Sequence, residues 1–210
     1  MSESDKKEPA LFSLALRDIA IVLSAFSLWA ATDSWFQVTG LLFAEVISAA
    51  NALFVGYLLG AIFHEWGHYA GAKFSKSVAP LFQPKDITSL FRFNFDFSLN
   101  NTYQFHCMSF GGWIAHWGVL LLLFMLIPMD TLGRVFLIAS LFGFVVFATV
   151  IEIGILKKTF SGLEPKLALG ELSKRNFQTA SIFGAGSGIT TAFIFEHRRH
   201  SFVCLQGSYV

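Results

Sequence analysis

Apolar residues gather in four long runs along the chain, and each run predicts a helix that crosses a membrane. The runs cover residues 14–31, 46–72, 107–129 and 135–156. About 20 mostly apolar residues in a helix cross the ~30 Å hydrocarbon core of a bilayer. The first run is the weakest, because Arg17 and Asp18 interrupt it. The pattern predicts an α-helical integral membrane protein with about four transmembrane helices.

A different period appears between the second and third runs. From Phe91 to Leu99 apolar and polar residues alternate without a break, and alternation returns from Tyr103 to Cys107. A period of two is typical of a strand with one apolar face, and the asparagines at positions 100 and 101 suit a turn between two strands. We expect a small β-hairpin at about residues 90–106.

The residues after the fourth run are expected to form a tail. Residues 163–177 fit an amphipathic helix, and residues 181–195 are weakly apolar. The glycine-rich stretch from Gly184 to Gly188 lacks the GK[ST] ending of a phosphate loop, which predicts a flexible linker. The chain is therefore divided into a membrane domain, 1–156, and a cytoplasmic or interfacial tail, 157–210. The sequence leaves open whether the tail contains a fifth span.

Composition supports a membrane protein and excludes other classes. Charged residues make up 14% of the chain and hydrophobic residues 54%, whereas about a quarter of a soluble domain is charged. A net charge of +1 without a basic stripe argues against nucleic-acid binding. The two cysteines form no CxxC pair, so neither a disulfide framework nor a thiolate zinc site is expected. Membrane lipid is the expected surrounding, and the oligomeric state stays open.

Basic residues in short loops predict the orientation of the spans. They gather before the first span, between the second and third, and after the fourth: Lys6, Lys7, Arg17, Lys73, Lys76, Lys85, Arg92, Lys157, Lys158 and Lys166. Four spans with both termini in the cytoplasm place every one of these clusters inside. The mixed charge of the first residues favours a retained first span over a cleaved signal peptide. We expect an integral protein of the cell's inner or plasma membrane.

The strongest chemical signal is the pentad His-Glu-Trp-Gly-His at residues 64–68. In a helix, the HExxH spacing puts His64 and His68 on one face, where they bind zinc, with Glu65 beside the metal. The same letters occur by chance in helices that bind nothing. Inside a membrane span, however, two histidines and a glutamate are costly unless they have partners or a function. Gly56 and Gly60 precede His64 at four-residue spacing, which predicts that this face packs against other helices.

Two further polar residues are expected at the depth of the pentad. In the predicted topology, His64 and His68 lie near the cytoplasmic end of the second span. At 1.5 Å per residue, Glu152 lies ~6 Å from the cytoplasmic end of the fourth span, and His116 lies ~14 Å into the third. Trp66, Trp113 and Trp117, which flank these residues, are interpreted as packing residues.

At these positions the sequence resembles the site-2 protease family of intramembrane zinc metalloproteases. The family pentad is typically HExGH, which Gly67 matches. Phe110-Gly111-Gly112-Trp113 is similar to the family's Gly-Gly element, which follows a β-hairpin, and residues 112–116 are similar to a degenerate GPxxN motif with Trp113 for Pro and His116 for Asn. The resemblance covers about residues 45–156 and implies Zn²⁺ as cofactor, Glu65 as general base and single-pass membrane proteins as substrates.

The third zinc ligand has two candidates. A catalytic zinc site needs a third protein ligand and an open position, and the family supplies an aspartate from an LDG-type motif. The sequence around Asp130 is closer to that motif, but Asp130 lies ~20 Å or more from the depth of the pentad. Glu152 has the right depth and is the expected ligand. Alternatively, Glu152 pairs with His116 or Lys157, and Asp130 caps the fourth helix.

The sequence predicts an intramembrane zinc endopeptidase with metal ligands His64, His68 and Glu152 and catalytic residues Glu65 and His116. His116 replaces the family's asparagine and is expected to hydrogen-bond the reacting carbonyl; a metal ligand or a satisfied interior histidine are the alternatives. Departures from the family pattern at Trp113, His116 and Glu152 leave open a second class. This is a proteolytically inactive family member that binds membrane partners or carries metal.

Overall fold

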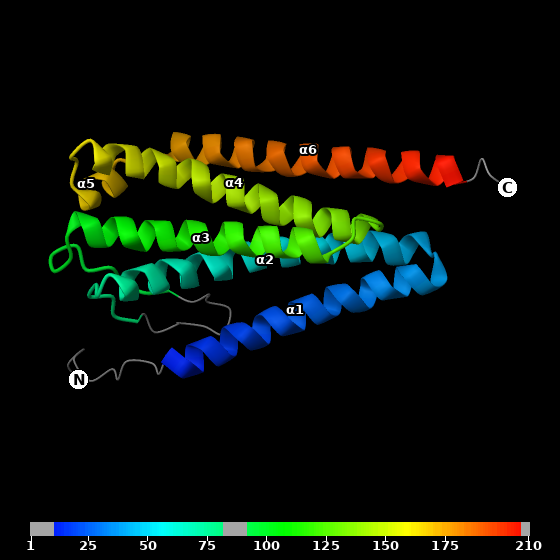
Figure 1. Ribbon diagram of the computed structural model, residues 1–210, viewed down its shortest axis with the longest axis horizontal. Coiled ribbons are helices and arrows are strands. Elements are labelled where there is room, and N and C mark those ends of the chain that lie inside the picture. The colour runs from blue at the N-terminus through cyan, green and yellow to red at the C-terminus, as the bar shows by residue number, and fades with distance from the viewer. Residues whose placement is uncertain (1–10, 82–91, 207–210) are drawn as a thin grey trace.

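The computed structural model describes residues 11–81 and 92–206, and these form six helices joined by loops (Figure 1). In chain order the helices are α1 (Leu11–Thr39), α2 (Leu42–Phe74), α3 (Thr102–Leu126), α4 (Leu132–Phe160), α5 (Pro165–Gly170) and α6 (Lys174–Gln206). The first four are long and apolar enough to cross a membrane. They correspond to the four predicted spans. Three of the helices extend their predicted span at both ends, whereas α3 starts five residues earlier and ends three residues earlier than predicted.

Local sequence signals mark several of the helix ends. The turn between α1 and α2 passes through Gly40, whose φ of 66° suits glycine. A capping box starts α3, in which the Asn101 side chain accepts from the Gln104 backbone N–H and the Gln104 side chain accepts from the Asn101 N–H. Thr131 caps α4 by accepting from the backbone N–H of Arg134. Each of these caps satisfies backbone donors that the first turn of a helix leaves free.

Helix α2 is the centre of the bundle. It packs against α1, α3 and α4, while α6 lies along α4 on the far side (Figure 1). Glycine permits the closest contacts of α2: Gly56 lies against the backbone of α4 at Leu137, and Gly67 lies against the backbone of α3 at Gly111. A methyl group at either position would overlap its neighbour. The prediction that this face of α2 packs against other helices, and not against lipid, is confirmed.

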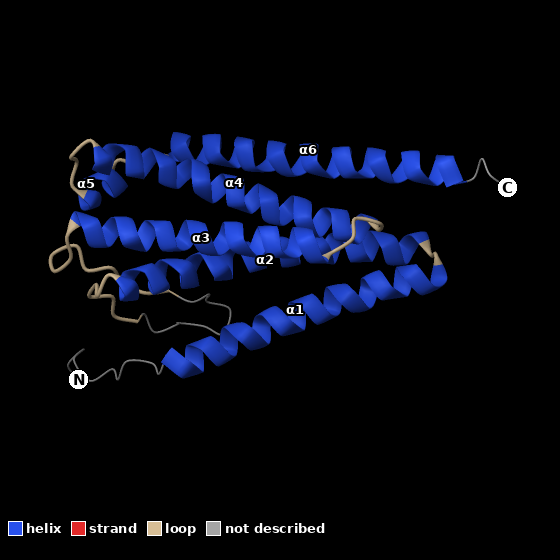
Figure 2. Ribbon diagram, in the orientation of Figure 1, coloured by secondary structure: helices blue, strands red, loops and turns tan. Residues whose placement is uncertain are grey.

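The predicted β-hairpin at about residues 90–106 is wrong. No strand occurs in the described residues (Figure 2), and residues 90 and 91 lie outside them. The second predicted strand is instead the first turn of α3, because the capping box at Asn101 starts a helix there. The alternating segment pairs weakly with the residues after α2, through one antiparallel bridge between Leu81 and Phe93.

The Gly-Gly element is also not a turn after a hairpin. Gly111 and Gly112 lie in the interior of α3, where their missing side chains let α2 approach. Gly111 touches the backbone of Gly67 and Gly71, and Gly112 lies under the ring of His68.

The tail contains one long helix, so the linker predicted at residues 184–188 is wrong. Those residues lie in the interior of α6, and Gly184 and Gly188 face the backbone of α4 at Gly143 and Ala139. This pair is a small-xxx-small seam of the kind that brings membrane helices close. The run of glycines in the sequence suggests a flexible segment. In the structure the glycines are needed because α4 packs closely against them.

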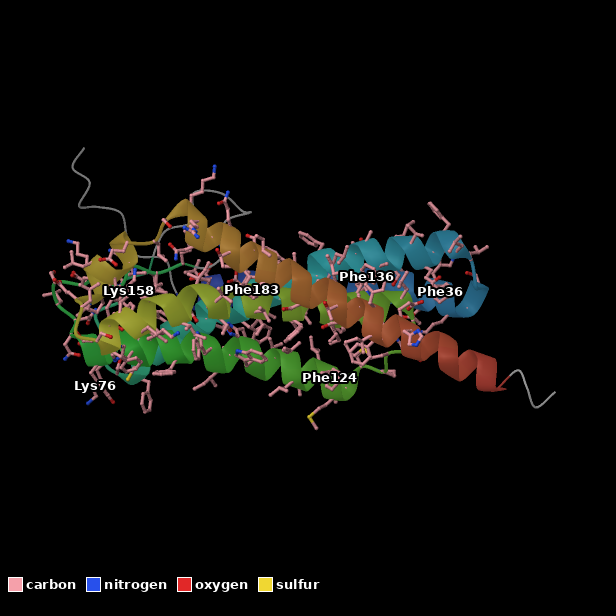
Figure 3. All side chains as sticks on the ribbon, turned by 90° about the horizontal axis from the view of Figure 1, so that it is seen from above. Phe36, Lys76, Phe124, Phe136, Lys158 and Phe183 are labelled. Atoms are coloured by element: carbon pink, nitrogen blue, oxygen red, sulfur yellow. The ribbon has the colours of Figure 1, made fainter. Side chains whose placement is uncertain are left out.

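Basic side chains mark one end of the bundle. Lys76, after α2, and Lys158, near the end of α4, lie at the same end, whereas Phe36 and Phe124 lie toward the other (Figure 3). Helix α1 begins at the lysine end, and α6 runs from that end to the opposite one (Figure 1). The start of α1 and the end of α6 therefore lie at opposite ends of the bundle (Figure 1).

The path of α6 along α4 predicts that α6 crosses the membrane, although it is less apolar than α1–α4 and is not among the four helices that qualify as spans by length and composition. The C-terminus would then lie on the opposite side of the membrane from the N-terminus. Residues 177–195 contain no Asp, Glu, Lys or Arg and span about 28 Å as a helix, close to the hydrocarbon thickness. A topology reporter fused after Val210 should lie on the opposite side from one inserted after Gly170. Both reporters on the same side would show that α6 lies outside the bilayer and would restore two cytoplasmic termini.

Candidate metal centre

Two histidines of α2 and one glutamate of α4 converge inside the bundle. The Nε2 atoms of His64 and His68 are 3.0 Å apart, as expected for residues one helical turn apart on the same face. Glu152 Oε1 lies 2.9 Å from Nε2 of His68 and 3.6 Å from Nε2 of His64. Among the described residues, these three side chains form a group that could hold a metal ion.

The size of this triangle fits a tetrahedral metal ion. Bonds of about 2.0–2.2 Å to tetrahedral zinc place neighbouring ligand atoms about 3.3–3.6 Å apart. The three separations of 2.9, 3.0 and 3.6 Å therefore need to change by only a few tenths of an ångström. Two imidazoles and one carboxylate are a donor set that zinc accepts, and they leave the fourth position open.

Hydrogen bonds orient both imidazoles toward the centre of the triangle. Nδ1 of His68 donates to the backbone carbonyl of Met108, 2.9 Å away, in the tautomer that leaves Nε2 free as a ligand. Nδ1 of His64 is 2.8 Å from Nδ1 of His116, and the two rings are stacked 4.9 Å apart. If Nε2 of His64 binds metal, its Nδ1–H donates to His116, whose proton is then on Nε2.

His116 is fully buried in α3 beside the cluster. Its Nε2 atom has no hydrogen-bond partner among the described residues. Buried polar atoms in folded proteins nearly always have a partner. Because Nδ1 of His116 faces Nδ1 of His64, its Nε2 points away from the triangle. The geometry therefore supports a role for His116 in orienting His64, and not the expected hydrogen bond to a reacting carbonyl. The two ends of the degenerate GPxxN motif thus both meet the pentad, Gly112 at His68 and His116 at His64.

Glu65 lies half-buried next to the ligands, with electrostatic interactions to His68, Glu152 and Arg92. It is not one of the three residues of the triangle. A carboxylate in this place can accept a proton close to a metal ion without occupying a coordination position.

Asp130 is not part of the cluster. Its side chain is 63% exposed and accepts from Arg134 across 2.7 Å, ahead of α4. Asp130 does not cap α4, as the alternative prediction had it; the cap is the next residue, Thr131. The depth of Glu152 and Asp130 along their helices therefore indicates the third ligand correctly, whereas the LDG-like sequence around Asp130 does not.

Two contacts near the site were not anticipated from the sequence. The indole N–H of Trp66 donates to the buried Asp18 of α1 across 2.9 Å, and that of Trp117 donates to Thr149 of α4. The sequence alone predicts only a packing role for both tryptophans. An acidic residue inside an apolar run was the available signal, because such a residue needs a buried partner.

An apolar cavity of about 730 Å³ lies between α2, α4 and α6, and none of the three cluster residues lines it. Phe144 of α4 separates the cavity from the metal centre, with its ring 6.0 Å from that of His64 and 5.3 Å from that of Tyr57. The cavity extends along α4 past Phe136, which Figure 3 labels. Aromatic and aliphatic side chains dominate its walls: Leu53, Tyr57, Phe136, Phe144, Phe147 and Phe193.

The cluster predicts how zinc binding responds to substitution. Replacing Glu152 by alanine removes a ligand, which should lower zinc affinity by more than about 100-fold, since even residues that only orient ligands contribute 10–100-fold. Asp130→Ala, the matched control, should leave the affinity unchanged. Metal titration of the purified proteins by isothermal calorimetry measures both. Zinc affinity that fell in the Asp130 variant but not in the Glu152 variant would reverse the assignment.

The structure brings together His64, His68 and Glu152, with His116 and Glu65 adjoining them, and leaves Asp130 apart. No family model, curated protein or solved structure matches the chain. The geometry of this cluster and its surroundings is therefore the basis for assigning a function.

Proposed function

We propose that this chain is an intramembrane zinc endopeptidase of the site-2 protease type, which cleaves single-pass membrane proteins. The observation that carries the proposal is the His64–His68–Glu152 triangle with Glu65 beside it, inside a bundle of membrane-length helices. Such a set of ligands, with an acid/base carboxylate next to it, suits hydrolysis better than permanent structural binding, because a fourth position stays open.

The chemistry divides between the metal and the chain's own residues. Zinc, when bound, supplies a lowered water pKa and polarises the peptide carbonyl. Glu65 takes the proton from the attacking water on a carboxylate oxygen and later delivers it to the leaving amine. Nδ1 of His116 accepts from the Nδ1–H of His64 and so orients that ligand, while Nε2 of His116 points away from the metal position. The Met108 carbonyl holds the His68 ring in the tautomer that keeps Nε2 available.

The substrate has to present an extended peptide to this site. A helical segment engages its carbonyls in its own hydrogen bonds, so it must unwind before cleavage. The alternating segment at residues 92–96 is a poor receptor, because Asn94 and Asp96 already donate backbone hydrogen bonds to Pro80 and Val78. The apolar cavity behind Phe144 is the better candidate. Phe144, one of its lining residues, has its ring 6.0 Å from that of His64, and the cavity's side chains match an apolar segment.

The location follows from the basic end of the bundle. We assign that end to the cytoplasmic side of an inner or plasma membrane, following the preference of lysine and arginine for that side. The metal centre then lies within the bilayer on its cytoplasmic half. Ionisable residues inside a membrane are costly, which makes a cluster of them a candidate functional site.

Glu65→Gln tests the assignment of the base. The change keeps the size and shape of the side chain but replaces a carboxylate oxygen by an amide NH2, which cannot take up the proton, so cleavage should fall by about 10³-fold or more. Zinc content should stay at the wild-type level, because Glu65 is not a ligand. Cleavage of a model transmembrane substrate and metal analysis on the same protein check both expectations.

The same pair of measurements separates protease from carrier. A metal carrier or an inactive relative binds zinc through His64, His68 and Glu152 but cleaves nothing, with or without Glu65. Zinc binding by the wild-type chain without cleavage of any transmembrane peptide would therefore favour the carrier. Undiminished cleavage by the Glu65→Gln protein would show that another group is the base.

Neighbouring residues of α6 allow a matched test of the cavity. Ala185 lines it, whereas Gly186 faces away and has open space around it. Ala185→Trp should fill the cavity and raise the KM for a transmembrane peptide by about tenfold, the effect of roughly 1.4 kcal/mol of lost apolar contact. Gly186→Trp should leave KM near the wild-type value. Equal effects of the two variants would place substrate docking elsewhere.

A further inference from the structure

Asp18 of α1 is a buried acidic residue that contacts the pentad. Its side chain is 2% exposed, although most of α1 is exposed at the surface of the bundle. Oδ1 accepts from two nitrogens of Arg17, at 2.7 and 2.9 Å, and Oδ2 accepts from the indole N–H of Trp66 at 2.9 Å. Trp66 is the third residue of the pentad, next to Glu65 in the chain.

The Asp18–Trp66 hydrogen bond acts on the turn of α2 that carries the ligands. Successive residues of a helix point about 100° apart, so Trp66 and Gly67 fix this turn from two directions. Gly67 rests on the backbone of α3 at Gly111, and Trp66 is tied to α1. Together the two contacts set how far this part of α2 can rotate about its own axis.

Small rotations of α2 matter at the metal centre. Side-chain atoms lie about 6 Å from the helix axis, so a rotation of about 10° carries a ligating nitrogen about 1 Å. Catalytic geometry has to be held to about 0.5 Å, and a 1 Å error can cost about 100-fold in rate. Glu152 comes from α4 and does not rotate with α2, so rotation also changes the triangle.

We propose that Asp18 is a positioning residue for the metal centre, acting through Trp66 to fix the rotation of the pentad turn. The proposal rests on the proposed function, in which His64, His68 and Glu65 do the chemistry. It gives α1 a role at the site although α1 contributes no ligand. Arg17 neutralises the carboxylate, which lets it accept the indole N–H at low exposure.

The same helix provides a matched control in Asp33. Asp33 is 3% exposed and is also paired to an arginine, with Arg134 Nε 2.8 Å from Oδ2. Its carboxylate accepts further hydrogen bonds from Thr131, Ser48 and Gln37. It ties α1 to α2 and α4 at the other end of the bundle, away from the pentad. Asp33 thus shares the burial and pairing of Asp18 but not its contact with Trp66.

Five variants of the full chain in detergent or nanodiscs test the proposal: Asp18→Leu, Asp18→Asn, Trp66→Phe, the double variant Asp18→Leu/Trp66→Phe, and Asp33→Leu. Cobalt in place of zinc reports the coordination geometry through its visible absorption. Hydrogen exchange of the backbone amides around Glu65–His68 reports the ordering of the turn without any metal.

Asp18→Leu and Trp66→Phe should each change the cobalt spectrum, speed amide exchange in the pentad turn and lower kcat by about 10–100-fold with little change in KM. The double variant should be no worse than either single one, since both remove the same contact. Asp18→Asn keeps an oxygen acceptor and should recover most of the activity. Asp33→Leu should lower the unfolding temperature and leave the spectrum, the exchange and kcat unchanged.

Two results would overturn the positioning role. One is a cobalt spectrum and pentad exchange in Asp18→Leu identical to wild type; the other is the same changes in Asp33→Leu, which would make Asp18 a general support of the bundle. A wild-type chain that binds neither cobalt nor zinc would refute the proposed function instead. The amide exchange would then still decide whether Asp18 orders the pentad turn.

Discussion

Helices α2 and α3 touch backbone to backbone, and the positions of the two pentad histidines relative to α3 follow from that contact. Gly67 and Gly71 on α2 meet Gly111 and Cys107 on α3 with no side chain between them. At this distance the ring of His68 covers Gly112, and its Nδ1 reaches the carbonyl of Met108. Any larger residue at these glycines would push the helices apart and take the imidazole away from its hydrogen-bond partner.

The hydrocarbon environment imposes a second constraint, because polar side chains there need partners. Three sets of partners among the described residues illustrate how the bundle satisfies it. One is the cluster around His64 and His68, one joins Asp18 to Trp66, and one joins Asp33 to Arg134 at the far end. The last is fully hydrogen-bonded and ties helices together. The first instead brings three potential ligand atoms within reach of one metal ion.

The sequence was informative where a signal depends on burial along one helix. The four spans, the face of α2 that packs inward, and the common depth of Glu152, His116 and the pentad all follow from counting residues along apolar runs. It misled where two structures share one pattern. The alternation that continues into residues 103–107 suits a strand, but the capping box at Asn101 starts α3 there. The glycines at residues 184–188 suit a linker, but they form the seam between α6 and α4.

The sequence by itself determined which side chains are polar within the membrane and how deep each one lies, because a helix rises by a constant step per residue. Only the tertiary structure decided which of them meet. Contacts between helices depend on how each helix is rotated and how closely its neighbours approach, and those quantities are set by pairs of distant residues such as Gly67 with Gly111 or Trp66 with Asp18. Neither member of such a pair identifies the other in the chain.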